Sequence, residues 1–200
     1  MTNTPTTLVL GSSSPFRKTL LERLMVPFEV ASPDIDETPK TDETPMELVE
    51  RLAVAKAQAI AKTHPDALII SSDQVAIHPS DNGDEIVGKP ITHECAVEQL
   101  KTASGKCIKL YTGIALLNSK TDELQSEVVP YKVHFKKLSD ATIESYLRKE
   151  KPYNCAGSVK SEGLGVVLIE KFEGDDPSTL IGLPLINLIN MLEKQGYSIL

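Results

Sequence analysis

The sequence has no tryptophan and only four phenylalanines and five tyrosines, so aromatic side chains can fill little of its interior. Leucine, isoleucine, valine and alanine must form most of the core, as in α/β proteins with buried aliphatic strands. An excess of positive charge is also missing, because 21 basic and 28 acidic residues give a net charge of −7. Nucleic acid polymers and anionic membranes bind to basic surfaces, so we expect neither as a partner.

Cysteine and histidine are too few and too scattered to form a disulfide or zinc framework. The three cysteines make no C-x-x-C pair, and the four histidines have no metal-ligand spacing. No apolar run approaches the ~20 residues of a membrane span, and the polar residues 1–7 do not resemble a secretory signal. We therefore expect a cytoplasmic protein with reduced thiols.

Strands and helices alternate along the chain. Apolar runs predict strands at 8–10, 27–31, 67–70 (resuming at 75–77 after a polar break), 107–118, 125–137 and 166–172. Helical spacing and capping residues predict helices through Leu24 and over 45–63, 93–103, 140–149 and 184–194, with a turn at 81–84. This alternation indicates an α/β fold with a mixed sheet, in one compact domain or two lobes around a cleft.

The segment after the first strand has the composition of an anion-binding turn. Gly11 is followed by three serines, which can cap the start of a helix, and by Arg17 and Lys18 in its first turn. Backbone N–H groups and the helix dipole attract anions there, and basic residues are unfavourable unless an anion lies between them. The alternative is a plain serine cap with exposed basic side chains. The sequence contains no Walker loop.

Two charged residues interrupt segments that are otherwise apolar. Lys56 follows Leu52 by four residues and so lies on or beside the apolar stripe of its helix. It could instead extend from the edge of that stripe into solvent. Asp73 stands at the polar break in the central strand, where a buried carboxylate needs a cation, a metal or a cleft. Its alternative is a turn aspartate bonded to nearby backbone.

Further charged residues lie in two loops, the acidic cluster Asp34-Ile35-Asp36-Glu37 and the segment Gly88-Lys89-Pro90. Taken alone, the acidic cluster could be an ordinary solvated loop. Together with Lys56 and Asp73, these residues supply oxygen ligands for Mg²⁺ or Mn²⁺, cations for phosphate groups and a carboxylate that can orient water. The combination indicates a hydrolase that acts on a triphosphate.

Short motifs follow one another in a recognisable order over roughly residues 8–195. They are S-x-S-P-x-R, D-E-T-P, R-L-A-x-x-K-A, S-D-Q and G-K-P, followed by Tyr111-Thr112-Gly113, Ala156-Gly157-Ser158, Ser161-Glu162-Gly163 and Gly182-Leu183-Pro184. This order resembles the Maf family of nucleotide pyrophosphatases. The resemblance implies an inosine triphosphatase-like fold: an elongated mixed sheet flanked by helices, with two lobes around a cleft. It also implies one domain over residues 8–200 after a flexible tail at 1–7, often forming a homodimer.

The activity implied by the resemblance is hydrolysis of a nucleoside triphosphate to the monophosphate and pyrophosphate with a divalent cation. Asp73 matches the family's proton acceptor, and Glu37 matches a second acidic residue, so we expect these two to hold Mg²⁺ or Mn²⁺. The residues that match phosphate-binding positions are Ser12, Ser14, Arg17, Lys56 and Lys89.

Three positions are similar to the subgroup that acts on 7-methyl-GTP, namely Phe16, Gln74 and Glu162. N7 methylation makes guanine cationic, and a cationic base favours an aromatic face. A carboxylate such as Glu162 could accept hydrogen bonds from the N–H edge of guanine. The alternative is that Phe16 is a core residue and Glu162 an exposed loop residue.

Other functions remain open from the sequence. The same chemistry could act on dTTP, UTP or other modified nucleotides, in which case the protein removes unwanted nucleotides. A nucleotide-binding regulator of cell division is a second alternative, although binding alone needs no water-activating carboxylate. A kinase is disfavoured by the missing Walker loop.

Overall fold

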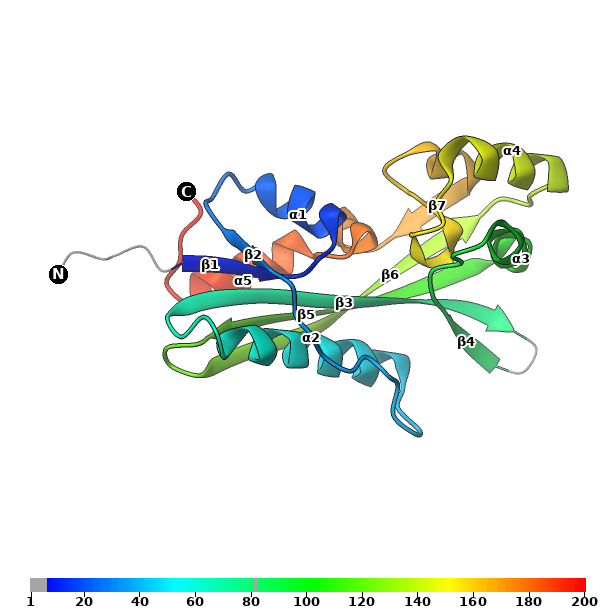
Figure 1. Ribbon diagram of the computed structural model, residues 1–200. Coiled ribbons are helices and arrows are strands. Elements are labelled where there is room, and N and C mark those ends of the chain that lie inside the picture. The colour runs from blue at the N-terminus through cyan, green and yellow to red at the C-terminus, as the bar shows by residue number, and fades with distance from the viewer. Residues whose placement is uncertain (1–6, 81–82) are drawn as a thin grey trace. The chain divides into compact units, whose positions relative to one another are not determined.

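The computed structural model describes residues 7–80 and 83–200, which form a mixed α/β fold (Figure 1). The α-helices among these residues are α1 (Pro15–Glu22), α2 (Pro45–Ala61), α3 (His93–Ala103), α4 (Asp140–Glu150) and α5 (Leu185–Lys194). The strands are β1 (Thr7–Gly11), β2 (Glu29–Ala31), β3 (Ala67–Ser80), β4 (Gly83–Val87), β5 (Cys107–Asn118), β6 (Glu123–Phe135) and β7 (Ile169–Glu173). Short 3-10 helices lie at η1 (Ala156–Ser158), η2 (Leu164–Leu168) and η3 (Pro177–Ile181).

The strands pair in the order β2-β1-β3-β5-β6-β7, with β4 paired to β3. The chain divides into two compact units: the first comprises the residues up to 74, 112–129 and 176–200, and the second comprises 75–111 and 130–175. Strands β3, β5 and β6 contribute residues to both units. Over the described ranges, no helix combines the length and the apolar character that crossing a membrane requires.

In the first unit, helices cover both faces of the sheet because the side chains of each strand alternate between the faces. On one face, Leu8 and Leu10 of β1 pack with the buried leucines of α1 and α5. On the other face, Val9 of β1 packs with Ala53, Ala57 and Ile60 of α2. This division follows from continuous aliphatic strands, which are buried on both sides.

Strand β1 runs parallel to both of its neighbours, β2 and β3. Its register with β3 pairs Leu10 with Ile70 and Gly11 with Ser71. The carboxyl end of β1 therefore lies beside the polar stretch of β3. Ligand sites in α/β proteins commonly lie at the carboxyl ends of such strands.

Helix α2 begins with the capping box that its sequence predicts. The Thr44 side chain accepts a hydrogen bond from the Glu47 backbone, the Glu47 side chain accepts one from the Thr44 backbone, and Pro45 occupies the first turn. Its apolar stripe is buried, with Leu52 and Ala53 at 3% and 0% exposed. These contacts fix the start and the rotation of the helix that carries Lys56.

The second unit contains β4, which pairs antiparallel with the outer part of β3, and β7, which pairs antiparallel with β6. Helices α3 and α4 belong to the same unit. Residues 81–82 of the predicted turn at 81–84 lie outside the described residues.

Most of the predicted elements are confirmed. Strand β4 was not predicted, since Gly83 and Asp84 were expected in the turn at 81–84, and three predicted elements differ. The predicted break in β3 at 71–74 is wrong, because the strand is continuous from Ala67 to Ser80. The strand expected at 27–31 is confined to Glu29–Ala31, and the one expected at 166–172 begins only at Ile169, after η2. Of the expected tail, Thr7 belongs to β1 and residues 1–6 lie outside the described residues. A single domain over residues 8–200 stays a prediction.

Gly113 provides a test of how closely α2 approaches the sheet. A Cβ atom at Gly113 of β5 would lie 2.2 Å from the Val49 carbonyl oxygen of α2, and that oxygen belongs to rigid backbone. We expect Gly113→Ala to lower the free energy of unfolding by about 3 kcal/mol, the upper range for overpacking. Gly88→Ala is the matched control, since a Cβ there meets nothing within 4 Å. Urea unfolding of both variants checks this, and equal midpoints would contradict the close approach.

Candidate active site

The polar stretch of β3 is buried, and its hydroxyl groups are bonded to neighbouring backbone. Ser71 and Ser72 are both 0% exposed. The Ser71 hydroxyl donates to the Ala53 carbonyl of α2 at 2.6 Å, and the Ser72 hydroxyl donates to the Gly182 carbonyl at 2.8 Å. Because buried polar groups with partners carry little penalty, the strand continues through this stretch and places Asp73 within the sheet.

Lys56 lies between two carboxylates. Its Nζ is 2.6 Å from Asp73 Oδ1 and 2.8 Å from Glu37 Oε1. Lys56 is 6% exposed, which rules out the alternative that its side chain extends into solvent. A buried ammonium needs such partners, because an unpaired charge is very costly to remove from water. Asp73, Lys56 and Glu37 form what we call the central cluster.

The central cluster carries one positive and two negative formal charges, which leaves 1 − 2 = −1. The Glu37 side chain is 59% exposed, so the cluster opens toward solvent on that side. Asp73 Oδ1 is bonded to Lys56, whereas Oδ2 accepts no hydrogen bond from the described residues. One carboxylate oxygen of Asp73 is therefore available to a ligand or a water molecule.

The oxygens of Asp73 and Glu37 fit a hard divalent cation such as Mg²⁺, which is usually held by one or two carboxylates together with phosphate oxygens and water. Within residues 7–80 and 83–200, no group of three or more His, Cys, Asp and Glu side chains is placed to hold a metal ion. Two carboxylates fill only part of the coordination of such a cation, so the remaining oxygens would come from water or a ligand.

Arg17 connects the start of α1 to β3. Ser14 is the N-cap of α1 and accepts from Arg17 N at 3.4 Å, and Ser12 Oγ accepts from Ser14 N at 3.2 Å. The guanidinium donates from Nη1 to the Ser72 carbonyl at 2.7 Å. These bonds bring Ser12, Ser14 and Arg17 to the strand residue that precedes Asp73.

The charge of Arg17 is coupled to the central cluster. Burial lowers the pKa of Arg17, while the negative charges of Asp73 and Glu37 act in the opposite direction. The group stays protonated because a guanidinium does not deprotonate in proteins. Nε and Nη1 bond to protein carbonyls, whereas Nη2 donates to none of the described residues. Nη2 is thus the nitrogen that remains for an anion.

Gly182 has a structural role that its place in the sequence did not reveal. Its φ of 109° lies in the region that favours glycine, and a Cβ there would lie 3.2 Å from Arg17 Nε. Its carbonyl accepts from Arg17 Nε at 2.8 Å as well as from Ser72 Oγ. The only sequence signal for Gly182 was its place in the Gly-Leu-Pro motif, which is one of the motifs that resemble the Maf family.

Gln74 is oriented by two hydrogen bonds. Its Nε2 donates to Thr112 Oγ1 at 2.8 Å and to the Thr179 carbonyl at 2.7 Å. Because a carbonyl only accepts, the Thr179 contact fixes which end of the amide is nitrogen. Both N–H groups are therefore used within the protein, and the side-chain oxygen is the part of the Gln74 amide that remains for a ligand. Thr112 and Thr179 were not among the predicted site residues.

The remaining predicted residues are less constrained. Phe16 is half-buried and is not among the buried core residues, which argues against the core alternative. Lys89 and Glu162 are exposed and belong to the second unit, so the structure places neither with respect to Asp73. The Gly88 carbonyl, beside Lys89, accepts from Gly157 N at 3.3 Å and from Gln99 Nε2 at 3.2 Å. The G-K-P and A-G-S motifs thus meet within one unit.

Residues 7–195 match the family model described as Maf-like protein. The chain belongs to the Maf-like protein family. A Maf-like relative from Colwellia psychrerythraea (strain 34H / ATCC BAA-681), named 7-methyl-GTP pyrophosphatase, is 54% identical over 194 residues, which cover 97% of this chain and 95% of the relative. The family resemblance is confirmed, and this relative bears the name of the subgroup that it indicated.

Two solved structures resemble part of this Maf-like chain. The Ham1 protein of Staphylococcus aureus matches with a TM-score of 0.47 and 16% identity, over 64% of this chain and 71% of its own. A HAM1 protein from Coxiella burnetii matches with a TM-score of 0.46 and 18% identity, over 65% and 73%. The roles of the individual site residues stay predictions.

Proposed function

We propose that this Maf-like protein hydrolyses a nucleoside triphosphate, preferentially 7-methyl-GTP, to the nucleoside monophosphate and pyrophosphate. The observation that carries the proposal is the buried Lys56 between Asp73 and Glu37, with Arg17 beside it. Binding a triphosphate requires cations, and hydrolysing it requires a carboxylate that can accept a proton from water. The central cluster provides both in one place. The name of the relative from Colwellia psychrerythraea supports the same activity and substrate.

In this mechanism, water attacks the α-phosphorus in line with the departing pyrophosphate. Asp73 accepts the proton of the water through Oδ2, because Oδ1 is bonded to Lys56. Arg17 Nη2 and the hydroxyls of Ser12 and Ser14 donate to phosphate oxygens, where they stabilise the charge that develops in the transition state. Lys56 holds Asp73 in place and adds positive charge near the same oxygens. Lys89 supplies a further cation.

A divalent cation, Mg²⁺ or Mn²⁺, would be held by Asp73 and Glu37 and would supply charge neutralisation at the phosphate oxygens. The protein contributes the orientation of these carboxylates. Asp73 is fixed within β3, while Glu37 comes from the loop between β2 and α2.

Base selection is assigned to Phe16, Gln74 and Glu162. A half-buried phenyl ring next to the Arg17 position suits the flat, cationic face of 7-methylguanine. The oxygen of Gln74, turned away from Thr112 and Thr179, can accept from a base N–H group. Glu162 can accept from the same edge of guanine. A homodimer remains a further expectation.

The substrate is tested by release of pyrophosphate from 7-methyl-GTP, GTP, UTP and dTTP, each with Mg²⁺, with Mn²⁺ and with a chelator. We expect pyrophosphate in the presence of metal, with a higher kcat/KM for 7-methyl-GTP than for the pyrimidine nucleotides. Equal values for 7-methyl-GTP and UTP or dTTP would refute the specificity and leave the reaction class standing. Tight binding without pyrophosphate from any nucleotide would favour the regulator of cell division.

The role of Asp73 is tested by Asp73→Asn. This change keeps the shape of the side chain but removes the proton acceptor, so we expect kcat to fall about 10²–10⁴-fold. Asp66→Asn is the matched control, since Asp66 is an exposed carboxylate of the same unit whose ion pair is with the exposed Lys120. Asp66→Asn should unfold near the wild-type temperature. Asp73→Asn should fold but unfold at a lower temperature, because buried Lys56 loses a charged partner, so turnover is compared at a temperature at which both variants are folded. Near-normal turnover in Asp73→Asn would remove Asp73 from the catalytic role.

A further inference from the structure

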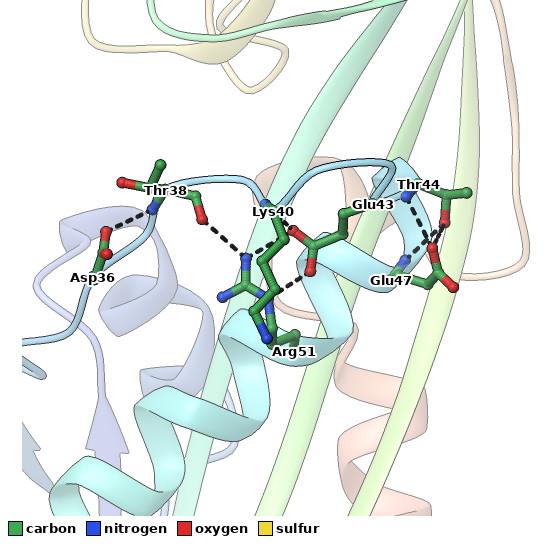
Figure 2. A network of polar contacts seen from close by, with 7 residues as sticks. All are labelled: Asp36, Thr38, Lys40, Glu43, Thr44, Glu47 and Arg51. Carbon is green, nitrogen blue, oxygen red and sulfur yellow. Dashed lines mark hydrogen bonds and ion pairs between the residues drawn. The ribbon is translucent and has the colours of Figure 1, made fainter.

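The loop that carries Glu37, residues 32–44, is attached to α2 by Arg51. Nε and Nη2 of Arg51 lie 2.5 and 2.8 Å from the two carboxylate oxygens of Glu43 (Figure 2). Nη2 also donates to the Thr38 carbonyl at 3.2 Å. A bidentate pair of this kind fixes orientation as well as distance. The side chains are only 24% and 7% exposed for Arg51 and Glu43, so the pair is better shielded than an ordinary surface ion pair.

Local hydrogen bonds complete the attachment of the loop. Asp36 Oδ1 accepts from Thr38 N at 2.9 Å, and these two residues flank Glu37. Farther along, Lys40 N donates to Glu43 Oε2 at 3.0 Å, and Glu43 N donates to the Lys40 carbonyl at 3.2 Å. The backbone that follows Glu37 is thus tied to the carboxylate–guanidinium pair at Thr38 and Lys40, and the Asp36 side chain is bonded to Thr38 (Figure 2).

The Glu37 side chain lies between two residues of this attached segment, Asp36 and Thr38. Its ion pair is with Lys56, and it is 59% exposed, so little packing holds it in place. Arg51 precedes Lys56 by five residues on α2, a rise of about 7.5 Å. In the part of the chain that the structure describes, Arg51 itself bonds to neither Lys56 nor Asp73. The charge of Arg51 interacts with that of Asp73 without a hydrogen bond, and loss of this positive charge alone would favour a bound cation. An effect of Arg51 on the position of Glu37 passes through the loop, and its loss would weaken cation binding.

The attachment keeps its charges over the whole neutral range. The hydrogen bond from Arg51 is the main cause that lowers the pKa of Glu43 to about 2 from its usual 4.5. For a carboxyl with a lowered pKa, the stabilisation is present above the usual pKa and is lost as the pH falls through the lowered one. The Arg51–Glu43 pair therefore does not titrate between neutral pH and about 4.5.

We propose that Arg51 is a positioning residue that holds Glu37 against the central cluster and thereby sets the affinity of the site for its divalent cation. This inference rests on the proposed function, in which Glu37 and Asp73 hold that cation. Arg51 touches no substrate. It acts by restricting the loop, so that the second carboxylate is already in place when metal and nucleotide arrive.

The kinetic test uses Arg51→Gln and Glu37→Gln, singly and together. Arg51→Gln should raise the Mn²⁺ concentration for half-maximal pyrophosphate release about tenfold, the lower range for loss of a residue that supports a metal ligand. It should change kcat at saturating Mn²⁺ much less. In the Glu37→Gln background, Arg51→Gln should change the Mn²⁺ concentration for half-maximal pyrophosphate release by less than about twofold. The reason is that the effects of substituting residues that act as a unit are not additive. An equal rise in this Mn²⁺ concentration when Arg51→Gln is made in the wild type and in Glu37→Gln would overturn the proposal.

Arg148→Gln is the matched control, because Arg148 is 76% exposed and its ion pair with Glu144 lies in the other unit. It should leave the Mn²⁺ dependence unchanged. Glu43→Gln removes the other half of the attachment and should reproduce the effect of Arg51→Gln. This second variant keeps the test decisive if Arg51→Gln does not fold. A normal Mn²⁺ dependence in Glu43→Gln would contradict the proposal.

Two measurements do not depend on turnover. Mn²⁺ binding, measured from the electron paramagnetic resonance of the free ion, should weaken about tenfold in Arg51→Gln. Trypsin should cleave after the exposed Lys40 severalfold faster, since the freed loop opens more often. Unchanged cleavage and unchanged Mn²⁺ binding would overturn the positioning role. If the wild type releases no pyrophosphate, the proposed function fails, whereas these two measurements still decide the role of Arg51.

Discussion

The burial of one positive charge organises the first unit. Lys56 is 6% exposed on a helix that packs closely on the sheet, and an ammonium in that position must be neutralised. Its two partners come from different parts of the chain: Asp73 from the middle of β3 and Glu37 from the loop before α2. The close approach of α2 at Gly113 and the attachment of the loop through Arg51 both keep these partners within reach.

Local patterns in the sequence were sufficient to predict most of the helices and strands and the types of residue in the candidate site. The structure has the continuous aliphatic strands, the capping box at Thr44 and the lysine within an apolar stripe that these patterns predict. The break at 71–74 was wrongly predicted, because nothing local shows that the two serines find partners in Ala53 and Gly182. Those partners are distant in sequence, so only the fold reveals them.

Local patterns could not predict the convergence of the site for the same reason, and the sequence implied it only through the family resemblance. A lysine, an aspartate and an acidic loop were each weak signals, and their contact depends on the packing of α2 against β3. Gly182, Thr112, Thr179 and Arg51 were missed because their roles are to orient Arg17, Gln74 and Glu37 rather than to carry chemistry. Lys89 and Glu162 were singled out by family motifs, and their part in the site rests on that resemblance.

In the proposed mechanism, the protein directs water to the α-phosphorus of a nucleoside triphosphate. The most direct test is a single turnover of 7-methyl-GTP in ¹⁸O-labelled water, with both products analysed by mass spectrometry. Attack at the α-phosphorus places the label in the nucleoside monophosphate and leaves the pyrophosphate unlabelled. Label in the pyrophosphate, or in free phosphate, would contradict the mechanism.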